Sequence, residues 1–340
     1  MIFQRSHKIF KKTLVPVLLL CLSIIISGLC FTHPSVAGTS PYKSHGRLLV
    51  KGTCIVDKNG DTTTLRGIST HGLAWYPQYV NKETFRTLRD EWNVNLIRLA
   101  MYTNEYGGYF NGGKESMADL VNKGVKYASE LGMYVIIDWH ILSDGNPLTH
   151  KKDAVDFFKK MAKKYKNNGH VIYEICNEPN GCSWQDVKDY ASAVIPAIRK
   201  YDKKAIILVG STTWSQDLDK VTASPLKYTK NIMYTCHFYA ATHKQWLRDR
   251  VDKAIRSGIP VFISEFSICD ASGNGSIDYT EANAWKSFIK KNHLSFAAWS
   301  LSNKAETSAL IKSSCTKTSS WKASDLSATG KYIKKMCKKG

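Results

Sequence analysis

The amino-acid sequence predicts an α/β fold, a (β/α)8 TIM barrel with a short N-terminal β-hairpin. Eight short apolar segments, each suited to burial on both faces, alternate with longer amphipathic segments. Eight such repeats over roughly 250 residues are typical of a closed barrel. The runner-up is an open doubly wound sheet, but no GxGxxG or Walker motif follows the first barrel strand.

The hairpin is expected within residues 46–64, where two short apolar runs flank Asp57-Lys58-Asn59-Gly60. An Asn-Gly pair between apolar runs is a strong signal for a hairpin turn. The barrel strands are then expected at residues 65–70, 94–100, 133–139, 171–176, 205–209, 232–236, 259–264 and 296–301. Helical periodicity between them predicts helices at residues 81–92, 117–131, 153–165, 184–201, 246–257 and 279–292.

The N-terminal segment has the pattern of a secretory signal. Four basic residues within the first twelve precede an uncharged stretch from residue 13 to residue 31, and Ser35-Val36-Ala37 supplies a small-x-small cleavage site. We therefore expect a signal peptide at 1–37, a polar spacer at 38–45 and a single catalytic barrel domain at 46–340. A retained membrane anchor is the alternative. After cleavage we expect a secreted monomer with no stable membrane association.

The composition suits a globular enzyme, since 43% of the 340 residues are hydrophobic and 22% are charged, which excludes a disordered or fibrous chain. The formal net charge of +20 could attract nucleic acid, and removal of the signal would lower it by four. The lysines, however, are spread along the helical segments, as in Lys159, Lys160, Lys163 and Lys164. They form no compact basic arm, so we expect solvated helix faces and no nucleic-acid partner.

Seven of the nine cysteines remain after the signal, and their spacing shows no zinc pattern. Cys176 and Cys236 lie inside apolar strands, where a small buried thiol is the usual role. Disulfides among the other five are compatible with export, but the spacing fixes no pairing.

Polar and aromatic residues follow the ends of the predicted strands, where barrels of this class place their chemistry. Two of them are carboxylates: Asn177-Glu178-Pro179 follows the fourth strand, and Glu265 follows the seventh. Strands four and seven lie on opposite sides of an eight-stranded ring, so Glu178 and Glu265 can face each other. Further strand-end residues are His71, Trp75, Arg98, Tyr102, Asp138, His140, His237, Tyr239, Trp299 and Lys304.

A facing pair of carboxyl groups is the equipment for cleaving a glycosidic bond with retention. One group protonates the leaving oxygen while the other attacks the anomeric carbon, at a separation of about 5–5.5 Å. Trp75 and Trp299 offer flat apolar faces on which a pyranose ring can stack.

The motifs together resemble family 5 glycoside hydrolases, specifically bacterial endo-β-1,4-glucanases. The resemblance covers residues 46–309 and rests on six runs in order: Arg98-Leu-Ala-Met-Tyr102, Asp138-Trp-His140, Asn177-Glu-Pro179, His237-Phe-Tyr239, Ser264-Glu-Phe266 and Trp299-Ser-Leu-Ser-Asn-Lys304. Asn-Glu-Pro alone is shared with related barrel glycosidases, whereas the ordered set is specific.

The resemblance implies a role for each of these residues. Glu178 would be the acid/base and Glu265 the nucleophile, with Asn177 on the sugar 2-hydroxyl. Arg98 and Tyr239 would hold Glu265 ionised and oriented, and His237 would lie close to Glu178. The glucose subsites would be lined by His71, Trp75, Tyr102, His140, Trp299, Lys304 and Glu306, with His140 also supporting catalysis.

Other roles were open for several of these residues. Asp138, His140 and His237 could form a metal site, but the carboxylate machinery is complete without one, so we expect neither metal nor cofactor. The run 269–278 resembles a calcium loop but lacks the terminal glutamate, which favours an ordinary loop. Glu174, inside a strand, is expected to have a structural or surface role, and His150, His170, His243 and His293 are expected at the surface.

The predicted activity is hydrolysis of internal β-1,4 bonds in cellulose or β-glucan. Related retaining enzymes act on mannan, xyloglucan or lichenan, and substrate choice depends on loop shapes that a sequence shows poorly. A barrel that binds carbohydrate without cleaving it is the remaining alternative.

Overall fold

Eight parallel strands close into a barrel in the computed structural model, which describes residues 40–338. The order around the ring is β10-β3-β4-β5-β6-β7-β8-β9, so each strand lies beside its neighbour in sequence and β10 closes on β3. The predicted (β/α)8 fold is confirmed. The barrel strands are β3 (Arg66–Thr70), β4 (Leu96–Tyr102), β5 (Tyr134–His140), β6 (Val171–Glu174), β7 (Ile207–Val209), β8 (Ile232–Tyr239), β9 (Val261–Ser267) and β10 (Phe296–Leu301).

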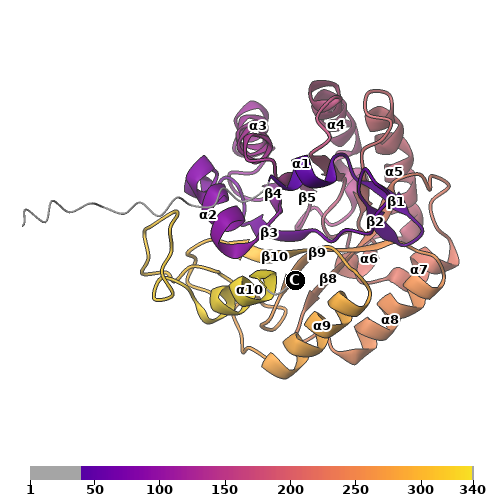
Figure 1. Ribbon diagram of the computed structural model, residues 1–340. Coiled ribbons are helices and arrows are strands. Elements are labelled where there is room, and N and C mark those ends of the chain that lie inside the picture. The colour runs from indigo at the N-terminus through magenta and orange to yellow at the C-terminus, as the bar shows by residue number, and fades with distance from the viewer. Residues whose placement is uncertain (1–39, 339–340) are drawn as a thin grey trace, which may run out of the picture. The chain divides into compact units, whose positions relative to one another are not determined.

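Amphipathic helices surround the barrel and bury their apolar faces on it (Figure 1). In α2, for example, Asn81 caps the first turn by accepting from the Thr84 amide, and Phe85, Leu88 and Trp92 are buried at helical spacing. The long helices are α2 (Lys82–Trp92), α3 (Lys114–Glu130), α4 (Lys151–Tyr165), α5 (Trp184–Arg199), α8 (Gln245–Arg256), α9 (Tyr279–Lys291) and α10 (Ala328–Lys338). Shorter helices are α1 (Pro41–His45), α6 (Thr212–Ser215), α7 (Leu218–Ala223), η1 (Pro77–Tyr79) and η2 (Pro147–His150).

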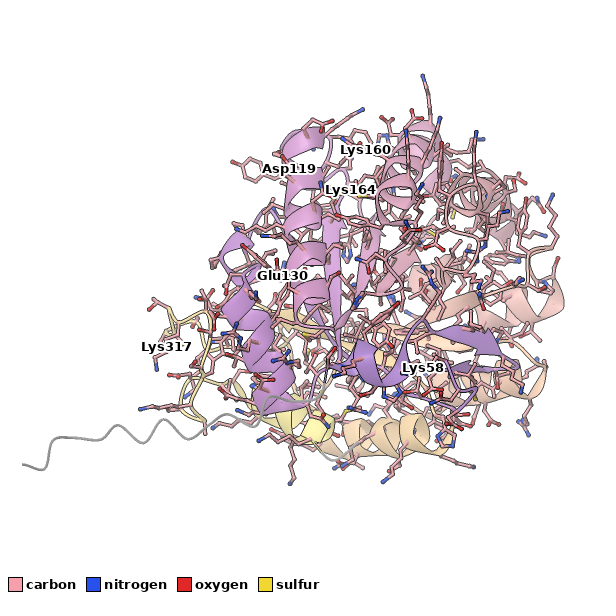
Figure 2. The ribbon with its side chains drawn as sticks, turned by 45° about the horizontal axis from the view of Figure 1, so that its top comes forward. Lys58, Asp119, Glu130, Lys160, Lys164 and Lys317 are labelled. Atoms are coloured by element: carbon pink, nitrogen blue, oxygen red, sulfur yellow. The ribbon has the colours of Figure 1, made fainter. Side chains whose placement is uncertain are left out.

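The outer helix faces carry the lysines that make the chain basic. Lys160 and Lys164 project from α4, and Asp119 projects from α3 (Figure 2). Lys160 forms an ion pair of 2.8 Å with Glu115. The lysines of α4 are exposed, as expected for a solvated helix face.

Inside the barrel, the layer nearest the amino-terminal ends of the strands, here called the lower layer, is apolar. The hairpin closes this end of the barrel. Ile55 of the hairpin packs with inward-facing residues of the strands, which are Leu65, Leu96, Tyr134, Ile136, Ile172, Ile206, Leu208, Met233 and Phe262. The hairpin strands are β1 (Leu49–Lys51) and β2 (Cys54–Val56). They reverse at Gly52-Thr53, where Gly52 has φ = +60°. The expected turn at Asn59-Gly60 is instead a second reversal, bridged by Val56 and Thr62.

The segment expected to be a polar spacer is partly structured. Residues 41–45 form α1, in which the Tyr42 amide donates to the Gly132 carbonyl at 2.8 Å. The Tyr42 ring stacks on His170 with centroids 3.7 Å apart. The aromatic side chain gives this otherwise polar segment a surface to pack, so it lies against the barrel.

A β-bulge in β9 directs the side chains of Ser264 and Glu265 toward the barrel interior. Thr235 of β8 pairs with Phe262, and His237 pairs with Glu265, so β9 has one more residue than β8 over this stretch. Strict alternation would direct Ser264 and Glu265 to opposite faces of the sheet. The extra residue changes that direction, and both side chains reach the interior network described below.

The chain continues past β10 into α10, a helix that was not among those predicted. Its Ile333, Met336 and Cys337 are buried, and it packs beside α2. Within residues 40–338 all seven cysteines are free thiols, and Cys176 and Cys236 are fully buried as predicted. No helix in the same range is both long and apolar enough to cross a membrane. The predicted signal peptide lies outside the described residues.

Candidate active site

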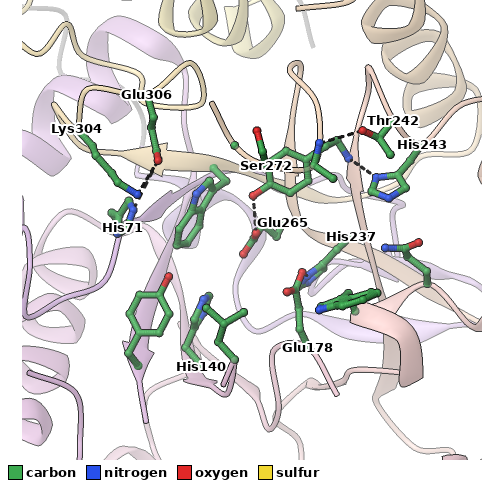
Figure 3. A pocket seen from close by; sticks show the side chains of 18 of the residues that line it. His71, His140, Glu178, His237, Thr242, His243, Glu265, Ser272, Lys304 and Glu306 are labelled. Carbon is green, nitrogen blue, oxygen red and sulfur yellow. Dashed lines mark hydrogen bonds and ion pairs between the residues drawn. The ribbon is translucent and has the colours of Figure 1, made fainter. Parts of the chain in front are cut away.

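A cavity of about 710 Å³ opens at the carboxyl ends of the barrel strands. It brings together most of the residues predicted from strand ends, including Glu178 and Glu265 (Figure 3). Arg98 and Asn177 lie buried beneath it. The predicted residues that line it are His71, Trp75, Tyr102, His140, Glu178, His237, Tyr239, Glu265, Trp299, Lys304 and Glu306.

The two carboxylates approach each other closely. A carboxylate oxygen of Glu178, a carboxylate oxygen of Glu265 and a ring nitrogen of His237 all lie within 4.8 Å of one another. Both side chains are largely buried, with Glu178 12% and Glu265 6% exposed. This spacing is well below the roughly 6.5–9.5 Å of inverting enzymes and close to the about 5–5.5 Å that a covalent, retaining mechanism requires.

Arg98 organises the floor of the cavity. Its guanidinium is fully buried and donates to the Glu265 carboxylate at 3.0 Å and to the Asn177 side-chain oxygen at 2.7 Å. It also pairs with Glu174 at 2.7 Å and with Asp138 at 3.0 Å. Burial alone would lower the pKa of Arg98, but the three carboxylates raise it above its ordinary value. The charge on Arg98 is therefore permanent.

Glu265 is held from a second side by Tyr239. The tyrosine hydroxyl donates to the other Glu265 oxygen at 2.9 Å. Burial, together with the negative charges of Glu265 and Glu178, raises the pKa of Tyr239 well above its ordinary value. Tyr239 therefore remains a donor, and both oxygens of Glu265 have a defined partner.

His237 connects Glu178 to the interior network. Its Nδ1 lies 2.8 Å from Glu178 Oε1 and its Nε2 lies 2.8 Å from Ser264 Oγ. Burial acts to lower the pKa of His237, but hydrogen bonding to Glu174 and Glu178 outweighs burial and raises it to about 9. At neutral pH the ring therefore carries a positive charge beside Glu178.

Glu174 is the structural residue of this network and has no surface role. It is fully buried, and Ser264 donates to it at 2.7 Å. Burial would raise its pKa, but the Arg98 charge and hydrogen bonds from His237 and Arg98 lower it to about 2. Glu174 is thus a fixed negative charge between two cationic side chains.

The three residues considered for a metal site do not converge on one point, because each histidine is hydrogen-bonded to different partners. His140 Nδ1 lies 2.5 Å from Asp138, whereas His237 bonds to Glu178 and Ser264. Burial and the nearby Arg98 charge lower the pKa of His140 to about 3, so its ring is neutral. It stacks parallel to Trp299 at 5.4 Å and supports that indole in the cavity wall.

One end of the cavity combines polar groups with aromatic rings. His71, Lys304 and Glu306 lie together there (Figure 3), with Lys304 2.6 Å from Glu306. Trp75 is 37% exposed and stacks on Tyr102 at 4.9 Å. Burial and the Lys304 charge lower the pKa of His71 to about 3, so the ring is a neutral hydrogen-bonding group.

The opposite end has residues that the sequence reasoning did not identify. Trp214 is 46% exposed and lines the cavity together with Gln216, Thr242 and His243. His243, expected at the surface, is buried, because the Tyr239 amide donates to its Nδ1 at 2.8 Å and fixes the ring inside. Trp214 follows the fifth barrel strand, β7, for which no strand-end residue was predicted.

The Trp214 segment is strained and hydrogen-bonded to the residues on either side of Glu178. Thr213, Trp214 and Ser215 have φ of +56°, +51° and +59°, a left-handed conformation that non-glycine residues rarely adopt. The Trp214 amide donates to the Pro179 carbonyl at 3.2 Å, and Ser215 Oγ donates to the Asn177 carbonyl at 2.7 Å. These bonds place Trp214 on the Glu178 side of the cavity.

The loop considered for calcium forms part of the cavity wall. Asp270 accepts from the Ser272 amide at 2.9 Å, and Asp278 caps α9 by accepting from the Glu281 amide at 3.0 Å. Both carboxylates therefore stabilise local backbone, while Ala271, Ser272 and Gly273 line the cavity.

Comparison with known proteins places this geometry in a family. A family model described as cellulase (glycosyl hydrolase family 5) matches residues 56–305. Endoglucanase A of Butyrivibrio fibrisolvens is 49% identical over 82% of this chain and 65% of its own length. An endoglucanase of Clostridium saccharobutylicum is 46% identical over 93% of this chain and 70% of its own length.

Solved structures agree. The structure of cellulase Cel5C_n is 42% identical, with a TM-score of 0.84 over 88% of this chain and 94% of that chain. The catalytic domain of a Thermobifida fusca endoglucanase, solved with cellotetraose, is 32% identical, with a TM-score of 0.84 over 88% of this chain and 99% of that chain. The protein belongs to the cellulase family, glycosyl hydrolase family 5.

Proposed function

We propose that this protein is a secreted endo-β-1,4-glucanase that cleaves β-glucan chains with retention of configuration. The observation that carries the proposal is the pair of carboxylates, Glu178 and Glu265, with oxygens within 4.8 Å of each other in a strand-end cavity. An inverting enzyme needs a wider gap to admit water between substrate and base.

The reaction proceeds in two displacements. In the first, a Glu265 oxygen bonds to the anomeric carbon while Glu178, in its protonated form, gives its proton to the departing glycosidic oxygen. In the second, Glu178 takes a proton from water, the water oxygen bonds to the anomeric carbon, and Glu265 leaves as a carboxylate. Two inversions at one carbon restore the original configuration.

The surrounding residues favour these roles. Arg98 and Tyr239 each bond one oxygen of Glu265, which holds the carboxylate in a fixed orientation for attack. Asn177 has its side-chain oxygen on Arg98 and its amide nitrogen donating to the Ile141 carbonyl at 3.0 Å. This anchoring holds the Asn177 side chain in one orientation, which supports its proposed contact with the sugar 2-hydroxyl. The charged His237 is hydrogen-bonded to Glu178, so the two groups can exchange a proton.

A glucan is the substrate best supported. The cavity holds aromatic platforms at both ends, with Trp75 at one and Trp214 at the other, which suits an internal segment of a long chain. The relatives that match most of this chain are named endoglucanases. Mannan, xyloglucan and lichenan remain the alternative substrates. Export by cleavage of residues 1–37 and a monomeric state complete the proposal.

The test is a polysaccharide panel. Purified protein is incubated with carboxymethylcellulose, barley β-glucan, mannan, xyloglucan and xylan, and reducing ends are followed with product size over time. We expect rapid chain shortening of the first two. A Glu265→Gln variant with an unchanged unfolding temperature should release none. Activity confined to mannan would overturn the substrate assignment, and no activity on any polymer would overturn the enzyme assignment.

A further inference from the structure

An exposed tryptophan stands beside the cavity without lining it. Trp246 is the second residue of α8 and is 47% exposed. Because α8 follows β8, its first turn lies on the same rim of the barrel as the active site. A large indole left half exposed gains little for folding, since its burial is incomplete.

Two contacts connect Trp246 to the cavity wall. Its ring meets the His243 ring edge-on, with centroids 5.9 Å apart, and His243 lines the cavity. On one face, the Arg250 guanidinium lies 5.4 Å from the ring centre. Arg250 in turn donates to the Gln216 carbonyl at 3.0 Å, and Gln216 is two residues after Trp214 and also lines the cavity. Trp246 therefore sits beside the end of the cavity that carries Trp214.

Arg250 also keeps the indole in one orientation. The guanidinium is held by Asp217 at 3.2 Å and by Asp219 at 2.9 Å. A ring that is braced in this way loses little side-chain entropy when a ligand stacks on it. Such a preorganised aromatic surface is suited to the apolar face of a sugar ring.

The direction of the bound chain follows from the two carboxylates. The acid/base must contact the leaving oxygen, so the leaving-group half of the chain extends on the Glu178 side. The Trp214 segment is bonded to residues 177 and 179 on that side. Thr242 and His243 lie at the end of the cavity opposite Lys304 and Glu306 (Figure 3).

We propose that Trp246 is a binding platform for a distal glucose unit on the leaving-group side, beyond the unit next to Trp214. This assignment rests on the proposed glucanase function. It extends the binding cleft past the cavity, so that Trp246 contributes to long chains and contributes nothing to short ones.

The experiment compares chain lengths. kcat/KM is measured for cellotriose through cellohexaose with wild type, Trp246→Ala and Trp246→Phe. We expect Trp246→Ala to lower kcat/KM for cellohexaose about 5-fold, equivalent to about 1 kcal/mol of stacking, with cellotriose unchanged. Trp246→Phe, which keeps an aromatic face, should recover most of the loss. The cleavage pattern of cellohexaose should shift toward bonds that leave fewer units on the Trp246 side.

Tyr279→Ala provides the matched control. Tyr279 is 51% exposed in the first turn of α9, on the same rim, and packs on Tyr332 without lining the cavity. It should behave as wild type at every length. Equal losses for cellotriose and cellohexaose in Trp246→Ala, or no loss at either length, would overturn the platform.

Failure of the glucanase proposal gives a different result. In that case wild type itself cleaves none of the oligosaccharides. Calorimetric titration of wild type and Trp246→Ala with cellohexaose then tests the platform. If Trp246 binds a glucose unit, removal of its ring should weaken cellohexaose binding about 5-fold. Equal affinities would overturn it.

Discussion

The lower and upper halves of the barrel interior are built from the same strands but differ completely in chemistry. In the lower half, Leu96, Ile136 and Ile172 pack in an apolar layer closed by the hairpin. Two residues further along the same strands, at the next inward-facing positions, stand Arg98, Asp138 and Glu174, which are fully buried, with both carboxylates paired to Arg98. Two residues along each strand thus separate an apolar packing layer from a charged layer that lies beneath the proposed active site.

Because of this contrast, substitutions of equally buried residues in the two layers should have different effects. Loss of volume in the lower layer should reduce stability and leave turnover intact. A change in the upper layer should alter turnover, and it should also alter stability wherever a buried charge loses its partner.

The largest expected effect is on activity, at Glu178. Glu178→Gln removes the proton donor and should lower kcat/KM on β-glucan by about 10²–10⁴-fold. A cellobioside with a dinitrophenyl leaving group, which departs without protonation, should lose far less in the first step. Lower-layer Ile136→Val is the control and should keep both rates. Equal losses of Glu178→Gln on the two substrates would show that Glu178 is not the acid.

Arg98→Leu should combine the two kinds of effect. It leaves Glu174 and Asp138 buried without their cation, so we expect a loss of about 3–5 kcal/mol in the free energy of unfolding, together with loss of turnover. Guanidinium titration followed by tryptophan fluorescence measures the first quantity. A loss below about 1 kcal/mol would mean that the network does not depend on Arg98.

Leu208→Ala should affect the lower layer alone. Leu208 is fully buried there, so a cavity should cost about 2–5 kcal/mol of unfolding free energy. At a temperature where the variant is folded, kcat on barley β-glucan should stay within about 2-fold of wild type. A larger fall in kcat would show that the layers are coupled.

The last expected effect is a pH dependence of stability. The pKa of His237 is about 9 in the folded protein, against an ordinary value of 6.5. Because the folded value is the higher one, its stabilising contribution is complete below pH 6.5 and is lost as the pH rises through about 9. His237→Gln should therefore show a flatter fall in unfolding temperature between pH 6.5 and 9 than wild type or Leu208→Ala. Parallel curves would contradict a protonated His237.

The sequence predicted the barrel because its strands are apolar on both faces and its helices are amphipathic, and both patterns are local. It predicted Glu178 and Glu265 because each follows an apolar run, and the place where such a run stops marks the end of a strand. The β9 bulge and the Arg98–Glu174 pair were not predicted, because they depend on register between strands far apart in the chain. Trp214 was missed although the same strand-end rule, applied to β7, would have found it.

His243 shows a further limit. A histidine in a polar run reads as a surface residue, yet an amide from Tyr239 and a contact with the Trp285 indole hold it inside. Such burial depends on a helix and a loop that meet only in the folded chain.

The most direct test of the account is the configuration of the newly formed sugar end. Proton NMR during the first minutes of cellopentaose hydrolysis resolves α from β anomers before mutarotation mixes them. Glu178 and Glu265, with oxygens within 4.8 Å, predict that the β anomer appears first. If the α anomer appeared first, water rather than Glu265 would have attacked the sugar, and the proposed covalent mechanism would be wrong.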